Sequence, residues 1–130
     1  MIGLDTNVLI RYLTQDDAKQ SKKANKLIEE KLTDSKPGFV TLITLVEIAW
    51  VLESCYDQQK DQIIFIIHSL LTTKQLVIES ADKVYLATKR YSTGGADFSD
   101  ALIAVISENS GCDIVMTFDK KAKSVGMELI

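Results

Sequence analysis

Apolar residues alternate along the chain between short unbroken runs and spaced positions that repeat every three or four residues. The short runs predict strands at 2–4, 39–41, 76–78, 113–117 and 127–129. The spaced positions predict longer helices over 16–33, 43–56, 58–71, 81–91 and 97–109, with short helices near 8–13 and 120–124. Because strands and helices alternate, the pattern predicts one α/β domain over residues 1–130, with a mostly parallel sheet joined by crossover helices.

Acidic residues stand at the ends of these elements. Asp5 follows the first strand, Asp119 follows the strand at 113–117, and Asp97 and Asp100 lie three apart at a helix start. Glu47 interrupts an otherwise apolar helix. Because the carboxyl ends of parallel strands share one rim of a sheet, Asp5 and Asp119 are expected to meet there, with the other three lining the same cleft.

Carboxylates gathered in one cleft repel each other unless a hard cation lies between them. Oxygen-only ligand sets suit Mg²⁺ and Mn²⁺. The acidic pattern therefore indicates a metal-dependent enzyme that acts on a phosphodiester. Structural roles compete with this interpretation, because aspartates also cap helices and interact favourably with the helix dipole. For Glu47 the alternative is an ion pair with Arg11 or a lysine, since an unpaired carboxylate is costly in an apolar helix.

Composition narrows the class of protein. A hydrophobic fraction of 46% and a charged fraction of 25% are those of a globular protein, and no apolar run approaches the roughly 18 residues of a membrane span. The net charge of −3 argues against a bare nucleic-acid binder, although bound metal would cancel part of it. Cys55 and Cys112 belong to no metal-binding motif, as expected of a reduced cytoplasmic protein. His68 is the single histidine, in an apolar helix, so a histidine base or zinc site is not expected.

Taken in order, Asp5-Thr-Asn7, Glu47, Ala96-Asp-Phe-Ser-Asp-Ala-Leu-Ile-Ala104 and Thr117-Phe-Asp119 resemble the PIN-domain ribonucleases, in particular the VapC toxins of toxin–antitoxin pairs. The resemblance spans essentially the whole chain. It implies a three-layer α/β/α fold, Mg²⁺ or Mn²⁺, RNA cleavage, a homodimer and a small antitoxin partner. It also implies metal binding by Asp5, Glu47, Asp100 and Asp119, with Asp97 as an extra acidic position and Asn7 and Thr117 as supporting polar residues.

Two other functions compete with a ribonuclease. A catalytically silent PIN-like module that binds RNA or an antitoxin would have lost an acidic ligand, and none is missing here. A Mg²⁺-binding receiver domain would carry an acidic pair after the first strand and an aspartate ending a middle strand. Asp5-Thr6 lacks the pair, and no aspartate follows the strands at 39–41 or 76–78.

The helix at 58–71 is more apolar than a one-sided helix on a small domain requires, and the helix before it carries Trp50 and Tyr56. Large aromatic side chains are favoured at protein interfaces. We therefore expect these two helices to supply a surface for the antitoxin or for a second copy of the chain.

Overall fold

The computed structural model describes residues 1–130 and contains two small parallel sheets. The first has the order β1 (Ile2–Gly3), β2 (Gly38–Val40) and β3 (Leu76–Ile78), and the second pairs β4 (Met116–Thr117) with β5 (Glu128–Leu129). The helices are α1 (Thr6–Thr14), α2 (Ala18–Asn25), α3 (Leu42–Tyr56), α4 (Lys60–Thr72), α5 (Ala81–Thr93) and α6 (Phe98–Asn109). The predicted α/β class and parallel pairing are confirmed. The strands form two sheets, however, where one was expected.

Most element boundaries fall close to the predicted ones, and the exceptions have local causes. The second predicted helix widens into a π-helix, η1 (Lys26–Lys31). The helix predicted from residue 58 begins at Lys60, because Asp57 takes a left-handed conformation (φ 52°) that ends α3. The strand predicted at 113–117 shortens to two residues, since its partner β5 has only two. A 3₁₀ helix, η2 (Lys120–Val125), joins β4 to β5.

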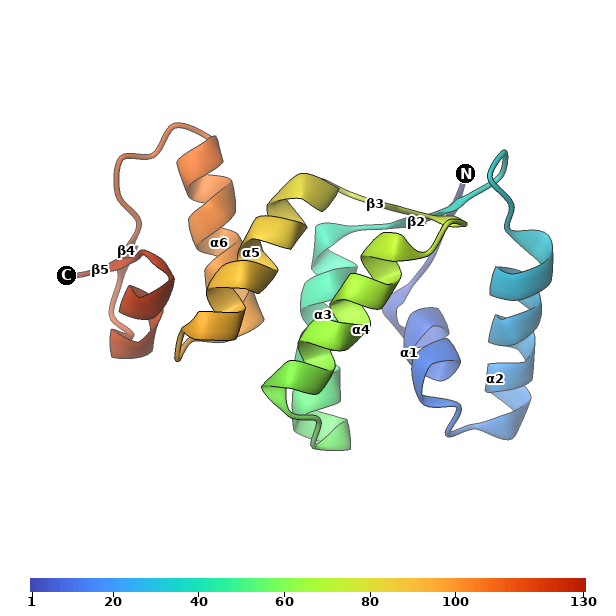
Figure 1. The fold of residues 1–130 in the computed structure, drawn as a ribbon. Helices are drawn as coiled ribbons and strands as arrows, with labels where there is room; N and C mark the ends of the chain where they lie inside the picture. Colours follow the sequence, from blue (N-terminus) through green and yellow to red (C-terminus); the bar gives the residue numbers. More distant parts are fainter.

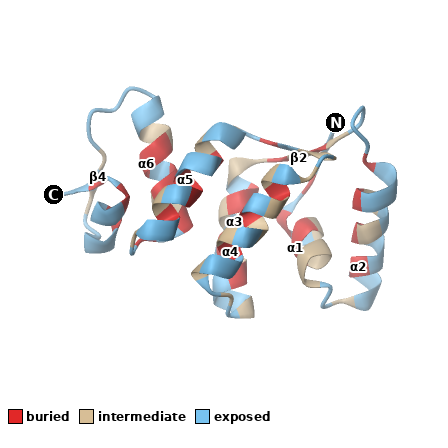
Figure 2. Ribbon diagram, viewed as in Figure 1, coloured by how far each residue is buried: buried red, intermediate tan, exposed pale blue.

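One apolar core joins the helices to the first sheet. Leu9 of α1, Val40 of β2 and Leu45 of α3 are fully buried in it. Phe98 and Leu102 of α6 belong to the same core, and Figure 2 shows buried residues along α3, α4, α5 and α6. A small separate cluster of Ala104, Ala122 and Met127 holds η2 and β5 against α6. Helices α5 and α6 are therefore tied to α3 and α4 by the main core.

The two sheets lie apart. Figure 1 shows β4, β5 and the C-terminus at one end of the molecule, beyond α6, whereas β1, β2 and β3 lie on the other side of α5 and α6, with β2 and β3 next to one end of α3 and α4. Strand β1 therefore has no strand on its outer edge, and neither has β4. No helix combines the length and the apolar character that crossing a membrane requires.

The apolar surface expected on α4 is smaller than the sequence suggested. Ile63, Ile67 and Leu70 are buried in the chain's own core, and Ile66 is half-buried. Figure 2 shows pale, exposed residues on the outer side of α4. The large apolar side chains left exposed are Phe65 on α4 (72% exposed) and Ile43 and Trp50 on α3 (74% and 64% exposed).

Candidate functional site

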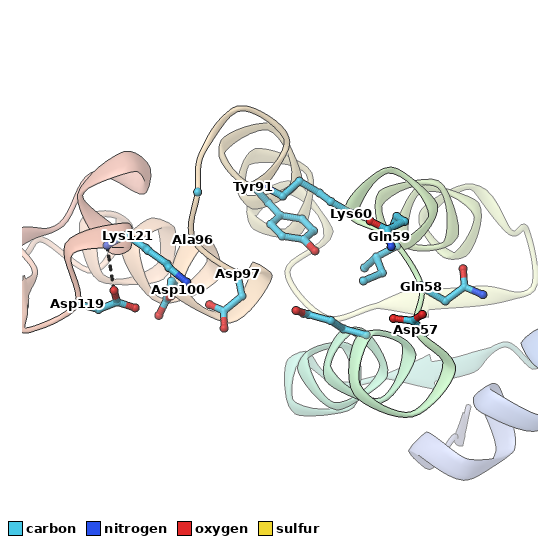
Figure 3. Close-up of a pocket in the computed structure, with 13 residues that line it drawn as sticks. Asp57, Gln58, Gln59, Lys60, Tyr91, Ala96, Asp97, Asp100, Asp119 and Lys121 are labelled. Carbon is cyan, nitrogen blue, oxygen red and sulfur yellow. Dashed lines mark hydrogen bonds between the residues drawn. The ribbon is translucent and has the colours of Figure 1, made fainter.

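A cleft of about 450 Å³ lies between the start of α4, the end of α5 and the start of α6. Asp97, Asp100 and Asp119 line one side of it, and Figure 3 shows these three carboxylates side by side. Lys121 extends beside them, while Lys60 and Tyr91 form the facing wall. Three carboxylates from two separate segments therefore converge on one cleft.

The start of α6 places two of these carboxylates. Gly94 and Gly95 separate α5 from α6, and Asp97 occupies the N-cap position with extended backbone and no side-chain cap hydrogen bond. Asp100 lies in the first turn, on the same side as Asp97. Ala101, the residue after Asp100, is buried in the core. Its small side chain lets α6 pack closely against its neighbours.

Asp119 is held by hydrogen bonds at the end of β4. Its Oδ1 accepts from the backbone N–H of Lys121 at 2.9 Å, which caps η2. Its own N–H donates to Thr117 Oγ1 at 3.0 Å. The capping role weighed for Asp119 is therefore present. The second carboxylate oxygen of Asp119 receives no hydrogen bond from the protein.

Crowding changes the acidity of Asp100. A hydrogen bond with the Asp97 side chain, together with burial, raises the pKa of Asp100 from 3.8 to about 6. Repulsion from the charges of Asp97 and Asp119 contributes in the same direction. The start of α6 thus holds excess negative charge that a cation or a proton relieves.

Asp5 and Glu47 lie together, but away from this cleft. Asp5 is exposed at the N-cap of α1 and makes no side-chain cap hydrogen bond, so a simple capping role does not explain it. The next residue, Thr6, donates its Oγ1 hydroxyl to Glu47 Oε1 at 2.9 Å. The expected meeting of Asp5 with Asp100 and Asp119 does not occur in this structure, because β1 and β4 belong to different sheets.

Glu47 differs from expectation in its surroundings. It is exposed where burial was expected, and the proposed ion pair with Arg11 is absent, since Arg11 Nη1 pairs instead with Asp16 at 3.2 Å. Glu47 and Asp97 both line a neighbouring apolar cavity of about 250 Å³ between α3 and α6. Glu47 therefore lies between the Asp5 position and the acidic cleft.

The two supporting polar residues fare differently. Thr117 contacts Asp119, as described above, whereas Asn7 lines a separate hollow with Arg11 and Gln20. His68 is a satisfied boundary residue, as expected, because its Nε2 lies 3.2 Å from Thr88 Oγ1.

Sequence reasoning missed the wall that faces the aspartates. Gln58, Gln59 and Lys60 come from the α3–α4 connection, and Tyr91 comes from the end of α5. Lys60 Nζ donates to the Gly94 carbonyl and lies 5.1 Å from the centre of the Tyr91 ring. The one available signal was the polar run that follows α3, which was predicted to begin the next helix.

Comparison with known proteins extends over nearly the whole chain. The family model described as "PIN domain" matches residues 2–127. A protein of Aquifex aeolicus (strain VF5) named VapC ribonuclease is 24% identical over 127 residues, which cover 98% of this chain and 93% of that protein.

Proposed function

Because this chain belongs to the PIN domain family, we propose that it is an endoribonuclease that hydrolyses RNA phosphodiester bonds and acts as the toxin of a toxin–antitoxin pair. The observation that carries the proposal is the cleft in which Asp97, Asp100 and Asp119 converge, at positions that match the family motifs. The similarity to a protein named VapC ribonuclease supports the same activity and a small antitoxin partner.

The proposed cofactor is Mg²⁺ or Mn²⁺, and the donors present are of the right kind. Asp5, Glu47, Asp97, Asp100 and Asp119 offer only oxygen ligands, which suit hard cations. Their arrangement within one chain does not complete a site, however. No three acidic, histidine or cysteine side chains lie close enough together to hold one ion. The single chain supplies a partial ligand set in two places.

Side chains around the cleft can perform the remaining tasks of phosphodiester hydrolysis. Lys121 is exposed beside the carboxylates, where its ammonium group can bind a phosphate of the RNA. In the metal-free chain, crowding by Asp97 and Asp119 raises the pKa of Asp100 to about 6, and a bound cation would relieve that repulsion.

The antitoxin is proposed to contact the exposed aromatic side chains of α3 and α4. Trp50 and Phe65 are the large aromatic groups that remain exposed there. Exposed aromatic residues are typical anchors of protein interfaces. A homodimer is also proposed.

The test is cleavage of a fluorescently labelled single-stranded RNA with Mg²⁺ or Mn²⁺, and with chelator. The wild-type chain is expected to cleave only with metal. Asp100→Asn is expected to lose activity by orders of magnitude, because it removes a charged oxygen ligand from the cleft. Asp113→Asn is the matched control, because it removes an exposed carboxylate outside the cleft. It is expected to retain wild-type activity.

Two outcomes would contradict the proposal. Undiminished cleavage by Asp100→Asn, or equal cleavage in chelator, would show that the acidic cleft takes no part in RNA cleavage. Tight RNA binding by the wild-type chain without cleavage, with both metals, would instead identify a catalytically silent binding module.

A further inference from the structure

The acidic residues are divided between two incomplete half-sites. One half-site follows β1 and consists of Asp5, with Glu47 hydrogen-bonded to Thr6. The other half-site is the cleft of Asp97, Asp100 and Asp119. Figure 1 shows α5 and α6 between β1 and β4, and neither half-site brings three acidic side chains close enough together to surround one ion. A complete acidic site therefore requires that the two half-sites be brought together.

The strands that precede the half-sites each have an open edge. In β1, the N–H groups of Ile2 and Leu4 donate to Pro37 and Phe39 of the β2 segment. Because successive N–H groups of a strand point to opposite edges, the Gly3 N–H and carbonyl point away from β2. The outer edge of β1 is therefore free to bind another strand.

Strand β4 is open in the same way. The carbonyls of Val115 and Thr117 accept from Glu128 and Ile130 of the β5 segment. The backbone groups of Met116 and Phe118 therefore point to the edge that no strand covers. In a parallel ladder one residue bonds the two residues that flank its opposite number. Gly3 placed opposite Thr117 would thus donate to Met116 and accept from Phe118.

This hydrogen-bonding register also aligns the half-sites. With Gly3 opposite Thr117, Asp5 comes opposite Asp119, at the shared carboxyl end of both strands. The same register places Ile2 opposite Met116, and these two side chains are 41% and 46% exposed. Half of the large apolar side chains that stand exposed lie in or beside β1, β4 and β5: Met1, Ile2, Ile114, Met116, Phe118, Leu129 and Ile130. Unpaired edges flanked by exposed apolar groups are sites of strand addition.

Closure within one chain would disrupt the core. Phe98 and Leu102 of α6 are 1% and 3% exposed and belong to the core that includes α3 and α4. Moving β4 across to β1 would pull α6 away from α3. Each large side chain exposed in that movement would lose the stabilisation that its burial provides. Pairing with a second copy leaves every one of these contacts in place.

We infer that two copies of this chain pair β1 of one with β4 of the other, so that Asp5 of one copy completes the acidic cleft of its partner. Each chain carries both edges, so a two-fold arrangement satisfies both pairs at once and leaves no open edge for further copies. The inference rests on the proposed function for its metal site. The strand pairing itself is testable without activity.

The decisive experiment uses disulfide formation between single-cysteine variants. The exposed Cys55 and Cys112 are first replaced by serine, and Ile2→Cys and Met116→Cys are made in separate chains. Opposed residues of paired strands have Cα atoms close enough for a disulfide. Mixing the two variants under mild oxidation is expected to give a cross-linked dimer in non-reducing electrophoresis. Glu30→Cys, on the exposed side of η1, replaces Met116→Cys as the control and is expected to give none.

A second variant tests the same strand pairing through the mass of the assembly in solution. Gly3→Pro removes the one N–H that points to the open edge and leaves the hydrogen bonds to β2 intact. Sedimentation is expected to show a dimer for the wild-type chain and a monomer for Gly3→Pro, with the helical circular dichroism unchanged. A wild-type monomer, or a disulfide that forms only when Ile2→Cys and Met116→Cys occupy one chain, would overturn the inference.

Activity adds a third measurement once RNA cleavage is established. Asp5→Asn and Asp119→Asn are each expected to be inactive alone. In an equilibrated equal mixture half of the dimers contain both variants, and each of those holds one intact site of two. About one quarter of the wild-type rate is therefore expected. No recovery in the mixture, with wild type active, would place each site within a single chain.

Discussion

The replacement Asp100→Asn should separate the chemistry of the cleft from its stability. Asparagine keeps the shape of the side chain and can donate a hydrogen bond to the Asp97 carboxylate, as the protonated acid does. It removes the charge that Asp97 and Asp119 repel. We therefore expect the metal-free variant to be more stable than the wild-type chain at neutral pH.

The pKa of Asp100 sets the size of this effect. A rise from 3.8 to about 6 corresponds to roughly 3 kcal/mol at most, at about 1.4 kcal/mol for each pKa unit. Asp100 is only partly buried, so solvent screening reduces the expected gain to about 1 kcal/mol. For a chain of this length that gain raises the unfolding temperature by about 4 °C.

The effect of Asp100 on the stability of the wild-type chain depends on pH. Below about pH 4 the carboxyl group is protonated in both the folded and the unfolded chain, so wild type keeps its full stability from this group. As pH rises from about 4 to 6, the unfolded chain releases the proton first, and the folded wild-type chain loses stability. The advantage of Asp100→Asn should therefore be absent at pH 4 and complete above pH 7.

Urea unfolding in chelator at pH 4 and pH 7.5 measures the difference, with Asp113→Asn as the control for removing an exposed negative charge. That control is expected to change the unfolding free energy by less than about 0.5 kcal/mol at either pH. If Asp100→Asn were less stable than wild type at pH 7.5, or showed the same gain at both pH values, charge repulsion in the cleft would not be the cause.

Two further replacements test the fold. A methyl group at Gly38 would lie 2.7 Å from Leu4 Cδ1, so Gly38→Ala is expected to lower the free energy of unfolding, measured with urea, by about 1–3 kcal/mol. A methyl group at Gly3 would meet nothing within 4 Å, so Gly3→Ala should cost far less. Equal losses from the two variants would show that close packing around Gly38 is not the cause. Glu108→Gln weakens the pair in which Arg90 Nη2 lies 2.5 Å from the Glu108 carboxylate, which lowers the pKa of Glu108. The expected loss of about 0.5–1 kcal/mol at pH 7 should disappear as pH falls through the lowered pKa of this carboxylate, and a loss that persisted after protonation would point to packing instead.

Much of the fold was predictable because local patterns decide it. The apolar run of α3 and the glycine pair before α6 act within a few residues, and both elements form where the sequence predicts. The end of α3 at Tyr56 was also predicted correctly, whereas the start of α4 at Lys60 was missed because the polar run after Asp57 resembles the start of a helix. The length of β4 was missed because the partner strand sets it, and partner length is not a local property.

In the candidate site, too, local patterns predicted some features and not others. Asp97 and Asp100 share one helix turn, so their proximity followed from a spacing of three, and the raised pKa of Asp100 follows from that proximity. Asp119 joined them through the packing of η2 on α6, at the end of a correctly predicted strand. The wall of Gln58, Lys60 and Tyr91 gave no recognisable motif, because polar groups on a connection carry no periodic signal.

The position of Asp5 shows what local patterns leave open. The sequence correctly placed Asp5 after one parallel strand and Asp119 after another, but the rim argument assumed that both strands belong to one sheet. Strand order is set by which edges pair, and the edges of β1 and β4 carry matching backbone groups without pairing in this chain. A single chain therefore places both aspartates after parallel strands, as predicted, and still leaves its acidic site divided. Matching edges and a divided site have one explanation in common, which is that the sheet, and with it the site, is completed by a second copy.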